Sequence, residues 1–447
     1  MIKKSTLIFL LCAIILGGAF YYFDVKKGLG TKPADTTKPV FSVAEPDVDS
    51  LTLSHPAKSN EPSVLLTKKG SDWRIVQPVA SGADQSAVQG VLDNLTTSKI
   101  SETSEPATPD RLKEYGLTPP QVEVQLQLKN GAKHTLQMGD KDFTGSSVYA
   151  IVDGAKTVSL LPDWILTSAD KSLDDLRDHS VLHLTTYNVA SFTLKNPSGD
   201  LALGKSKGDQ WNFTKPTDAM ADPDSIDALL TAISNARIAS FVGENQSDLV
   251  KYGLKDPVVS FTATDDTGKK STLLLGKKDG NDYFARDTSR PSVFRVSADL
   301  YTQLTKKYAD LRDKKLLHFD QADITRVEIH NDHGTIEVES KTGNQWVLDS
   351  PSDQKGKAAA SYKIFDPLTE LRADEVIDHP AAGMLATLVK PAIEIVLTDK
   401  NGKKLTLKMS KPTGDTVYGQ GSESAALYKL KKQDFDNLNF DASSLLQ

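Results

Sequence analysis

Cysteine is almost missing from this chain of 447 residues, which contains only Cys12. A single cysteine excludes an internal disulfide framework and any zinc site that needs several thiolates. Aromatic residues make up only 7% of the chain, and the net charge is -6, with lysine and arginine spread along the sequence. A basic patch of the kind that binds nucleic acid is therefore absent, and we expect no nucleic-acid partner.

Long apolar runs are also missing, with one exception close to the first residue. Residues 6–23 carry no charge, follow Lys3 and Lys4, and end in aromatic side chains that include Tyr21, Tyr22 and Phe23. A helix of about 18 residues nearly crosses a hydrocarbon core of roughly 30 Å. Aromatic rings at its end suit the membrane interface. The sequence thus predicts one membrane-spanning helix.

This segment sets the expected localisation. We expect a transmembrane anchor over residues 1–27, a flexible linker over 28–40, and the bulk of the chain outside the cytoplasm. A cleaved signal peptide, with Gly17 and Ala19 as the small residues before the cut, is the alternative.

Three copies of one unit follow the linker. Trp73, Trp211 and Trp346 recur at nearly equal intervals along the sequence. The stretch "YGLTPP" at Tyr115 returns as "YGLKDP" at Tyr252, at almost the same interval. Landmarks that keep their order while the offsets drift indicate repeats with varying loops. The expected boundaries are 41–185, 186–320 and a divergent copy at 321–447.

Each copy combines strands with two helices. Alternating apolar and polar residues predict strands, and Asn130-Gly131 predicts a hairpin. The stripe Val88, Val91, Leu92 and Leu95, with Asp84 as N-cap, predicts a helix. A second helix is expected at 163–178 and at 298–313. An antiparallel meander between two helices favours the α+β class, so the predicted fold is three tandem α+β repeats behind a transmembrane helix.

Several of these motifs resemble the bacterial family DUF4340. The resemblance rests on "YGLTPP", the hairpin after it, "GSSVYAIVDG" and "SLDDLRDHSVL", and on "YGLKDP", "DYFARD" and "YADLRDKKLL" in the second copy. It spans residues 41–319 and extends weakly into the third copy. It implies an envelope protein with an N-terminal membrane segment, often associated with ABC-type export systems of the gliding-motility kind. It brings no catalytic residue.

One phrase occurs twice, as "DDLRDHSVLHL" from Asp174 and as "ADLRDKKLLHF" from Ala309. We predict that its charged residues hold successive copies together. The positive charge of an arginine is stabilised by the helix dipole at a helix C-terminus, and its guanidinium can form two hydrogen bonds to a carboxylate. Local helix capping is the competing interpretation. In the third copy we match the phrase to "FDNLNFDASSLLQ", from Phe435 to Gln447, where Leu438 keeps the apolar position and Asn437 and Asn439 replace Asp and Arg. The predicted junction residues are Asp175, Arg177, Asp178, Asp310, Arg312 and Asp313.

The remaining motifs favour structural roles. One tryptophan per copy is typical of a core residue, although a sugar-stacking row of the three indoles is the alternative. A tyrosine beside a turn glycine usually packs its ring, so Tyr115, Gly116, Tyr252 and Gly253 are predicted as core turns. "HNDHG" at His330 suits a hairpin turn better than a metal site. We therefore predict no catalytic residue, cofactor or metal.

These observations predict a non-enzymatic interaction protein, anchored once in the inner membrane and exposed to the periplasm or the cell surface. Tandem units offer a long binding surface. The family resemblance implies a membrane-protein partner within an ABC-type export complex. A module that binds polysaccharide or peptidoglycan is the alternative, followed by an unrecognised hydrolase.

Overall fold

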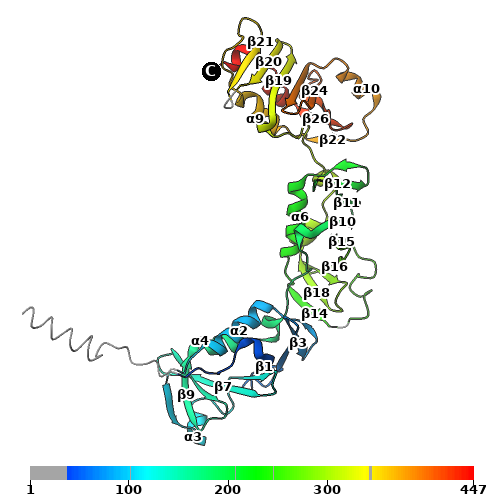
Figure 1. Cartoon of the computed structure of the whole chain (residues 1–447). Coiled ribbons are helices and arrows are strands. Elements are labelled where there is room, and N and C mark those ends of the chain that lie inside the picture. Colours follow the sequence, from blue (N-terminus) through cyan, green and yellow to red (C-terminus); the bar gives the residue numbers. More distant parts are fainter. Residues whose placement is uncertain (1–37, 101, 207, 245, 342–344, 447) are drawn as a thin grey trace, which may run out of the picture. The chain divides into compact units, whose positions relative to one another are not determined.

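The computed structural model describes residues 38–446, apart from 101, 207, 245 and 342–344. The chain divides into two compact units, Met1–His179 and Ser180–Gln447. The first unit contains one antiparallel sheet and the second contains two (Figure 1). The anchor predicted over residues 1–27 lies outside the described residues. Within the described part, none of the helices is long and apolar enough to cross a membrane.

The first sheet has nine strands in the order β4-β3-β2-β1-β6-β7-β8-β9-β5. Two meanders meet in its centre, where β1 pairs with β6 and Leu51 lies opposite Leu126. The strands are β1 (Val48–Ser54), β2 (Val64–Lys69), β3 (Asp72–Gln77), β4 (Ser81–Gly82), β5 (Glu102–Pro106), β6 (Val122–Leu128), β7 (Lys133–Lys141), β8 (Ser147–Val152) and β9 (Thr157–Pro162).

The second sheet repeats this order as β13-β12-β11-β10-β15-β16-β17-β18-β14. The third has eight strands in the order β21-β20-β19-β23-β24-β25-β26-β22, which is the same order without a counterpart of β4. In the second sheet the strands are β10 (Val189–Asn196), β11 (Gly199–Lys205), β12 (Trp211–Lys215), β13 (Ala219–Met220), β14 (Ser240–Gly243), β15 (Val259–Asp265), β16 (Lys270–Asp279), β17 (Asp282–Asp287) and β18 (Val293–Ser297). In the third they are β19 (Ile324–Asn331), β20 (Gly334–Ser340), β21 (Trp346–Ser350), β22 (Glu375–Ile377), β23 (Ile393–Asp399), β24 (Lys404–Met409), β25 (Thr416–Gly421) and β26 (Leu427–Lys431).

Helices are short and lie between the strands. The α-helices are α2 (Gln85–Thr97), α3 (Pro109–Glu114), α4 (Asp163–Ala169), α5 (Leu173–Leu176), α6 (Pro223–Asn235), α7 (Ala298–Leu304), α8 (Tyr308–Leu311), α9 (Tyr362–Glu370), α10 (Ala382–Leu385) and α11 (Lys432–Leu438). Single 3-10 turns are η2 (Glu45–Asp47), η3 (Thr186–Asn188), η4 (Gln321–Asp323), η5 (Ala386–Leu388) and η6 (Ala442–Leu445).

The α+β class expected from the sequence is wrong, because the chain is mostly β, with 42% strand and 22% helix. Two causes account for the difference. The two meanders of each copy join through a central strand pair into one large sheet. Moreover, the predicted helix at 163–178 is split into α4 and α5, because Ser172 and Asp175 form a capping box that starts a new helix.

The predicted first helix is confirmed in the first two copies, where it is α2 and α6. Asp84 accepts hydrogen bonds from the Ser86 and Ala87 amides at 2.9 and 3.0 Å and so caps α2. The apolar stripe Val88, Val91, Leu92 and Leu95 is buried, as is its counterpart Ile226, Leu229, Leu230 and Ile233 on α6. Each of these helices packs on the inner face of its own sheet.

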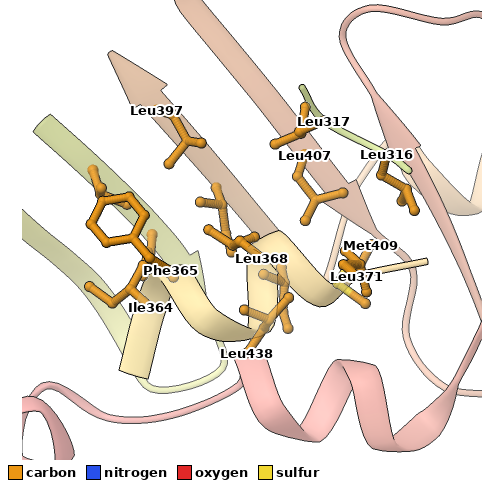
Figure 2. Close-up of a cluster of buried hydrophobic side chains, with 14 of the residues drawn as sticks. Leu316, Leu317, Ile364, Phe365, Leu368, Leu371, Leu397, Leu407, Met409 and Leu438 are labelled. Atoms are coloured by element: carbon orange, nitrogen blue, oxygen red, sulfur yellow. The ribbon is translucent and has the colours of Figure 1, made fainter. Parts of the chain in front are cut away.

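The third sheet encloses its own core (Figure 2). Ile364, Phe365 and Leu368 point from α9 toward apolar side chains of β23 and β24, and Leu438 joins them from α11. Leu316 and Leu317 enter the same cluster from the segment that precedes the sheet. The third core is therefore completed by residues of the connection from the second sheet.

The "YGL" turn explains a glycine in the neighbouring strand. The Tyr115 carbonyl accepts the Asp140 amide at 2.8 Å, and a Cβ built on Gly139 would lie 2.1 Å from that oxygen. In the second sheet the Tyr252 carbonyl stands at the same 2.1 Å from a Cβ built on Gly276. The turn thus packs backbone against backbone, which only glycine permits. In the third copy, which lacks "YGL", buried Ser410 follows the matching strand β24.

We predict that Gly139→Ala and Gly276→Ala each destabilise the sheet that carries them by about 2–4 kcal/mol, since the new methyl group must displace a backbone carbonyl. Gly90→Ala is the matched control. Its Cβ meets no atom within 4 Å on helix α2, so this change should stabilise the first unit by up to about 1 kcal/mol. Urea unfolding of each variant measures the effect, and equal stability of Gly139→Ala and the wild type would contradict the role of the turn.

Candidate functional site: the junction between the second and third sheets

The repeated phrase closes its own copy through its backbone. Arg312 forms a β-bridge with Ala221, and the Asp313 amide donates to the Met220 carbonyl at 3.0 Å. Arg177 forms the same bridge with Ala83. In the third copy Leu446 forms it with Ala359, so Leu446 and not Asn439 stands at the position of the arginine. Within the match over Phe435–Gln447, the alignment of Asn439 with the arginine is therefore wrong, because Asn439 is the C-cap of α11.

Two of the predicted junction residues serve as caps within their own copy. Asp175 accepts a hydrogen bond from the Ser172 amide at 2.9 Å, and Asp310 accepts one from the Lys307 amide at 2.8 Å. The Ser172 hydroxyl and amide hold the pKa of Asp175 below its ordinary value. For Asp175 and Asp310, these contacts are those of the competing interpretation, in which the charged residues of the phrase cap their own helix.

Arg312 reaches from the second copy into the third. Its side chain is 4% exposed, and both Nε and a terminal nitrogen donate to Oδ1 of Asp378 at 3.1 Å. Tyr308 donates its hydroxyl to Oδ2 of the same carboxylate at 2.7 Å. Asp378 directly follows the edge strand β22 of the third sheet. Burial and the bond to Asp378 raise the pKa of the Tyr308 hydroxyl well above its ordinary value.

His318 forms the second half of the junction. Its Nε2 lies 2.6 Å from Oδ2 of Asp313, and its Nδ1 lies 3.1 Å from Oε2 of Glu423. The His318 amide also donates to Glu423 at 2.9 Å. Just before it, the Leu316 carbonyl lies so close to β25 that a Cβ built on Gly421 would be 1.8 Å away. The segment from Leu316 to His318, which connects the second sheet to the third, is therefore held against the third sheet by charged hydrogen bonds and by close backbone packing.

The two carboxylates change the titration of His318. Its hydrogen bonds to Asp313 and Glu423 raise the pKa of the imidazole to about 9. Burial alone would raise the pKa of Asp313, yet its bond to His318 holds that pKa below the ordinary value. The same imidazole lowers the pKa of Glu423. A protonated His318 between two carboxylates is thus the favoured state at neutral pH.

A cavity of about 450 Å³ opens beside these residues. In it, Nε2 of His379 lies 3.4 Å from the Thr217 hydroxyl, which is longer than the separation of about 2.6–3.2 Å between a nucleophile and its base. Asp378 is engaged by Arg312 and Tyr308. The lining consists of Ser206, Asn212, Phe213, Thr217, Asp218, Ala219, Met220, Arg312, Asp378, His379, Glu423, Ser424, Ala425 and Ala426.

The other predicted residues lie elsewhere. Arg177 is 7% exposed and lines a cavity of about 260 Å³ in the first unit, together with His55. His55 is 4% exposed and lies between Glu61 and Asp170 at 3.2 and 3.0 Å. Throughout the described part of the chain, groups of three or more His, Cys, Asp or Glu side chains that could hold a metal ion are absent.

Of the predicted core residues, the three tryptophans and Tyr252 are buried, whereas Tyr115, Gly116 and Gly253 are half-buried. Trp73, Trp211 and Trp346 are 3%, 3% and 6% exposed and lie in the cores of the first, second and third sheets. Gly116 and Gly253 adopt φ of 64° and 70°, as their turns require. Tyr115 stacks on Tyr149 with ring centroids 3.9 Å apart, and Tyr252 meets Phe284 edge-on at 5.0 Å.

Sequence reasoning missed His318, Asp378 and Glu423. A signal for the histidine was present, because His183 and His318 occupy the same place in the two occurrences of the repeated phrase. Asp378 and Glu423 carry no such signal, because each comes from a strand end or loop far along the chain.

Comparison with known families gives two matches to one model, the domain of unknown function DUF4340, at residues 73–212 and 211–388. Together they cover more than half of the chain. The chain belongs to the DUF4340 family. A search of curated proteins found no match. Each match begins at a tryptophan strand and ends beyond the repeated phrase, so a DUF4340 match contains a junction segment as well as parts of two sheets.

The role of Arg312 at the junction can be tested by proteolysis. Arg312→Ala leaves Asp378 with one partner, and removal of one member of a buried ion pair costs about 3–5 kcal/mol. We expect trypsin to cut after Lys314 or Lys315 at least about tenfold faster than in the wild type. These lysines are held in the closed junction, where the Lys314 carbonyl accepts the Ala373 amide at 2.9 Å.

The control for this experiment is an exposed ion pair in the same unit. Lys432 and Asp436 on α11 are 48% and 44% exposed, so Lys432→Ala should change the cutting rate little. If Arg312→Ala accelerates cleavage equally throughout the second unit, Arg312 stabilises its own copy and the junction role fails.

A pH dependence follows from His318. Its folded pKa of about 9 lies above the ordinary value of 6.5, so its contribution is complete below about pH 6.5 and is lost as the pH rises through 9. Because a third of the side chain is exposed, we discount the contribution to about 1–2 kcal/mol. Asp313 and Glu423 have lowered pKa values, so their contribution is lost only as the pH falls below about 4.

Urea unfolding between pH 6 and 10 measures this dependence. The wild type should lose stability between about pH 6.5 and 9, and His318→Gln should flatten the profile over that range. His333→Gln, in an exposed turn, serves as control and should keep the wild-type profile. A His318→Gln profile that falls as steeply as the wild type would refute this assignment.

Proposed function

We propose that this DUF4340 protein is a non-enzymatic interaction protein of the bacterial envelope, attached to the inner membrane by residues 1–27. The body would lie on the periplasmic side or at the cell surface and contact a membrane-protein complex. The apolar run at residues 6–23 supports the attachment. The family resemblance supports an ABC-type export system as the partner. A single observation carries the interaction role, namely that one sheet order occurs three times, with an outer face of which the "YGL" segment covers only a part in the first two copies.

The outer face of a sheet is the side opposite its main helices, and these faces differ between copies. In the second sheet, Thr193, Thr262 and Thr272 lie side by side on three neighbouring strands, with the last two hydroxyls 2.9 Å apart. In the third sheet, Glu394 and Lys408 form a charged row, and His330 lies next to Glu394 on the neighbouring strand.

Different side chains on one repeated scaffold are typical of a binding surface. Beside the charged row of the third sheet lies a hollow of about 580 Å³, which Glu394, Lys408 and Glu423 help to line. We therefore place the contact with a protein partner on the outer faces, and most of all on the charged third sheet.

A polysaccharide-binding or peptidoglycan-binding module is the second candidate, and the hydroxyl row of the second sheet favours it. Hydroxyl groups can bond to sugars, but sugar rings also need exposed aromatic rings for stacking. Trp73, Trp211 and Trp346, which would have supplied them, are at most 6% exposed. This burial counts against the second candidate and leaves protein binding as the stronger proposal.

Affinity purification of the full chain from native membranes tests the proposal. We expect a membrane-protein complex to co-purify with the wild type. We further expect the charge reversal Glu394→Lys with Lys408→Glu, on the outer face of the third sheet, to reduce its recovery at least about tenfold. The charge reversal Lys432→Glu with Asp436→Lys, in an exposed ion pair on helix α11 and so away from the outer face, is the matched control and should leave recovery unchanged. Retention on cell-wall material with no membrane partner would overturn the proposal in favour of the second candidate.

A further inference from the structure

Two exposed aromatic side chains lie at one end of the first unit. Phe143 is 98% exposed at the tip of the β7–β8 hairpin, and Trp164 is 45% exposed in the first turn of α4. The other three tryptophans of the chain are at most 6% exposed. We call Phe143 and Trp164 the aromatic pair. Neither side chain is used by the core of the first sheet.

The hairpin presents Phe143 in a fixed geometry. The Asp142 amide donates to the Ser147 carbonyl at 2.8 Å, and the Asp142 carboxylate accepts the Ser147 amide at 3.0 Å and the Thr144 hydroxyl at 2.7 Å. These bonds close the loop without using the ring. The exposure of Phe143 therefore comes from a well-bonded turn that directs an apolar ring outward. Single exposed apolar side chains are common on protein surfaces, so what marks this end of the unit is the occurrence of Phe143 together with Trp164.

Further contacts join this hairpin to the start of α4. The Asp163 amide donates to the Ser146 carbonyl at 3.0 Å, and Lys141 pairs with Asp163 at 2.9 Å. Trp164 follows Asp163 directly. The aromatic pair thus belongs to one end of one body, with the lysine and carboxylate between its members neutralising each other.

The chain enters the first unit at the same end. The Lys38 carbonyl accepts the Ile100 amide at 2.8 Å, and Pro39 bridges Lys99. Strand β5 then begins with Glu102 opposite Leu160 of β9, and Ser147 of β8 lies opposite Pro162. Ile100, Pro162 and Ser147 are therefore at the same end of three neighbouring strands. Lys38 enters beside the aromatic pair.

We infer that the aromatic pair inserts into the interface of the lipid bilayer to which the chain is anchored, which deepens the proposed function and rests on its membrane attachment. The segment 24–37 joins the apolar run to Lys38 and spans at most about 48 Å, so the bilayer is within reach. Tryptophan and other aromatic rings favour the interface. Tethering raises the effective concentration, so two side chains suffice. The carboxylates of Asp140 and Asp142 add negative charge beside the Lys141–Asp163 pair, so the insertion gains nothing from anionic lipid.

The native tryptophans allow a direct test on the full chain. The full chain is incorporated into phosphatidylcholine vesicles whose acyl chains carry bromine. Bromine quenches the fluorescence of a tryptophan only when the two come close together. We expect quenching confined to one tryptophan of the four, because the other three are buried in the sheets. Trp164→Phe should abolish this quenching, and Phe143→Ser should reduce it severalfold. Tyr187→Ser, which removes a 78% exposed ring from the second unit, is the control and should leave it unchanged.

The outcomes separate the inference from the proposed function. If the chain floats with the vesicles but Trp164 emits equally in plain and brominated lipid, the inference is overturned and the attachment stands. If the chain does not float with the vesicles, the attachment fails and the inference with it. Protection of Trp164 in native membranes but not in protein-free vesicles would assign the aromatic pair to a protein partner and overturn the lipid assignment.

Discussion

The pairing of β1 with β6, and of its counterparts β10 with β15 and β19 with β23, holds the architecture together. Each pair joins two meanders that lie far apart along the chain and merges them into one sheet. Leu51 and Leu126 face each other at its centre and are at most 1% exposed. Because such pairing closes a loop of many residues, its entropic cost is offset only when both meanders and the helix between them pack together. Each sheet should therefore form as a whole.

This central constraint explains what the sequence could and could not predict. The hairpin at Asn130-Gly131 and the apolar stripe of α2 are set by neighbouring residues, and the structure contains both. The fold class was missed because joining two meanders depends on residues that are distant along the chain, which local periodicity does not report. The closing helices were overestimated because the cap at Ser172 outweighs the apolar period around it.

The candidate junction was predictable to the same limited degree. The repeated phrase pointed to Arg312 and Asp313, but it could not supply their partners. Asp378 and Glu423 both lie far beyond the phrase in the sequence, in the third copy. They reach the junction only because β22 forms the edge of the third sheet and because the loop after β25 follows the close packing at Gly421. The identity of such partners depends on the folded sheet.

The family matches and the sheets divide the chain at different places, and this difference connects fold with function. A fragment cut at residues 73 and 212 would lack β1 and β2, and hence the central pair of the first sheet. It would also carry β10 and β11 without β15 and without most of β12, the strands that flank them in the second sheet. The recurring stretch of sequence is thus unable to form a complete sheet by itself. It comprises the later strands of one sheet, the connection to the next copy and the first strands of that copy, which suits the proposed role of a protein that presents several faces.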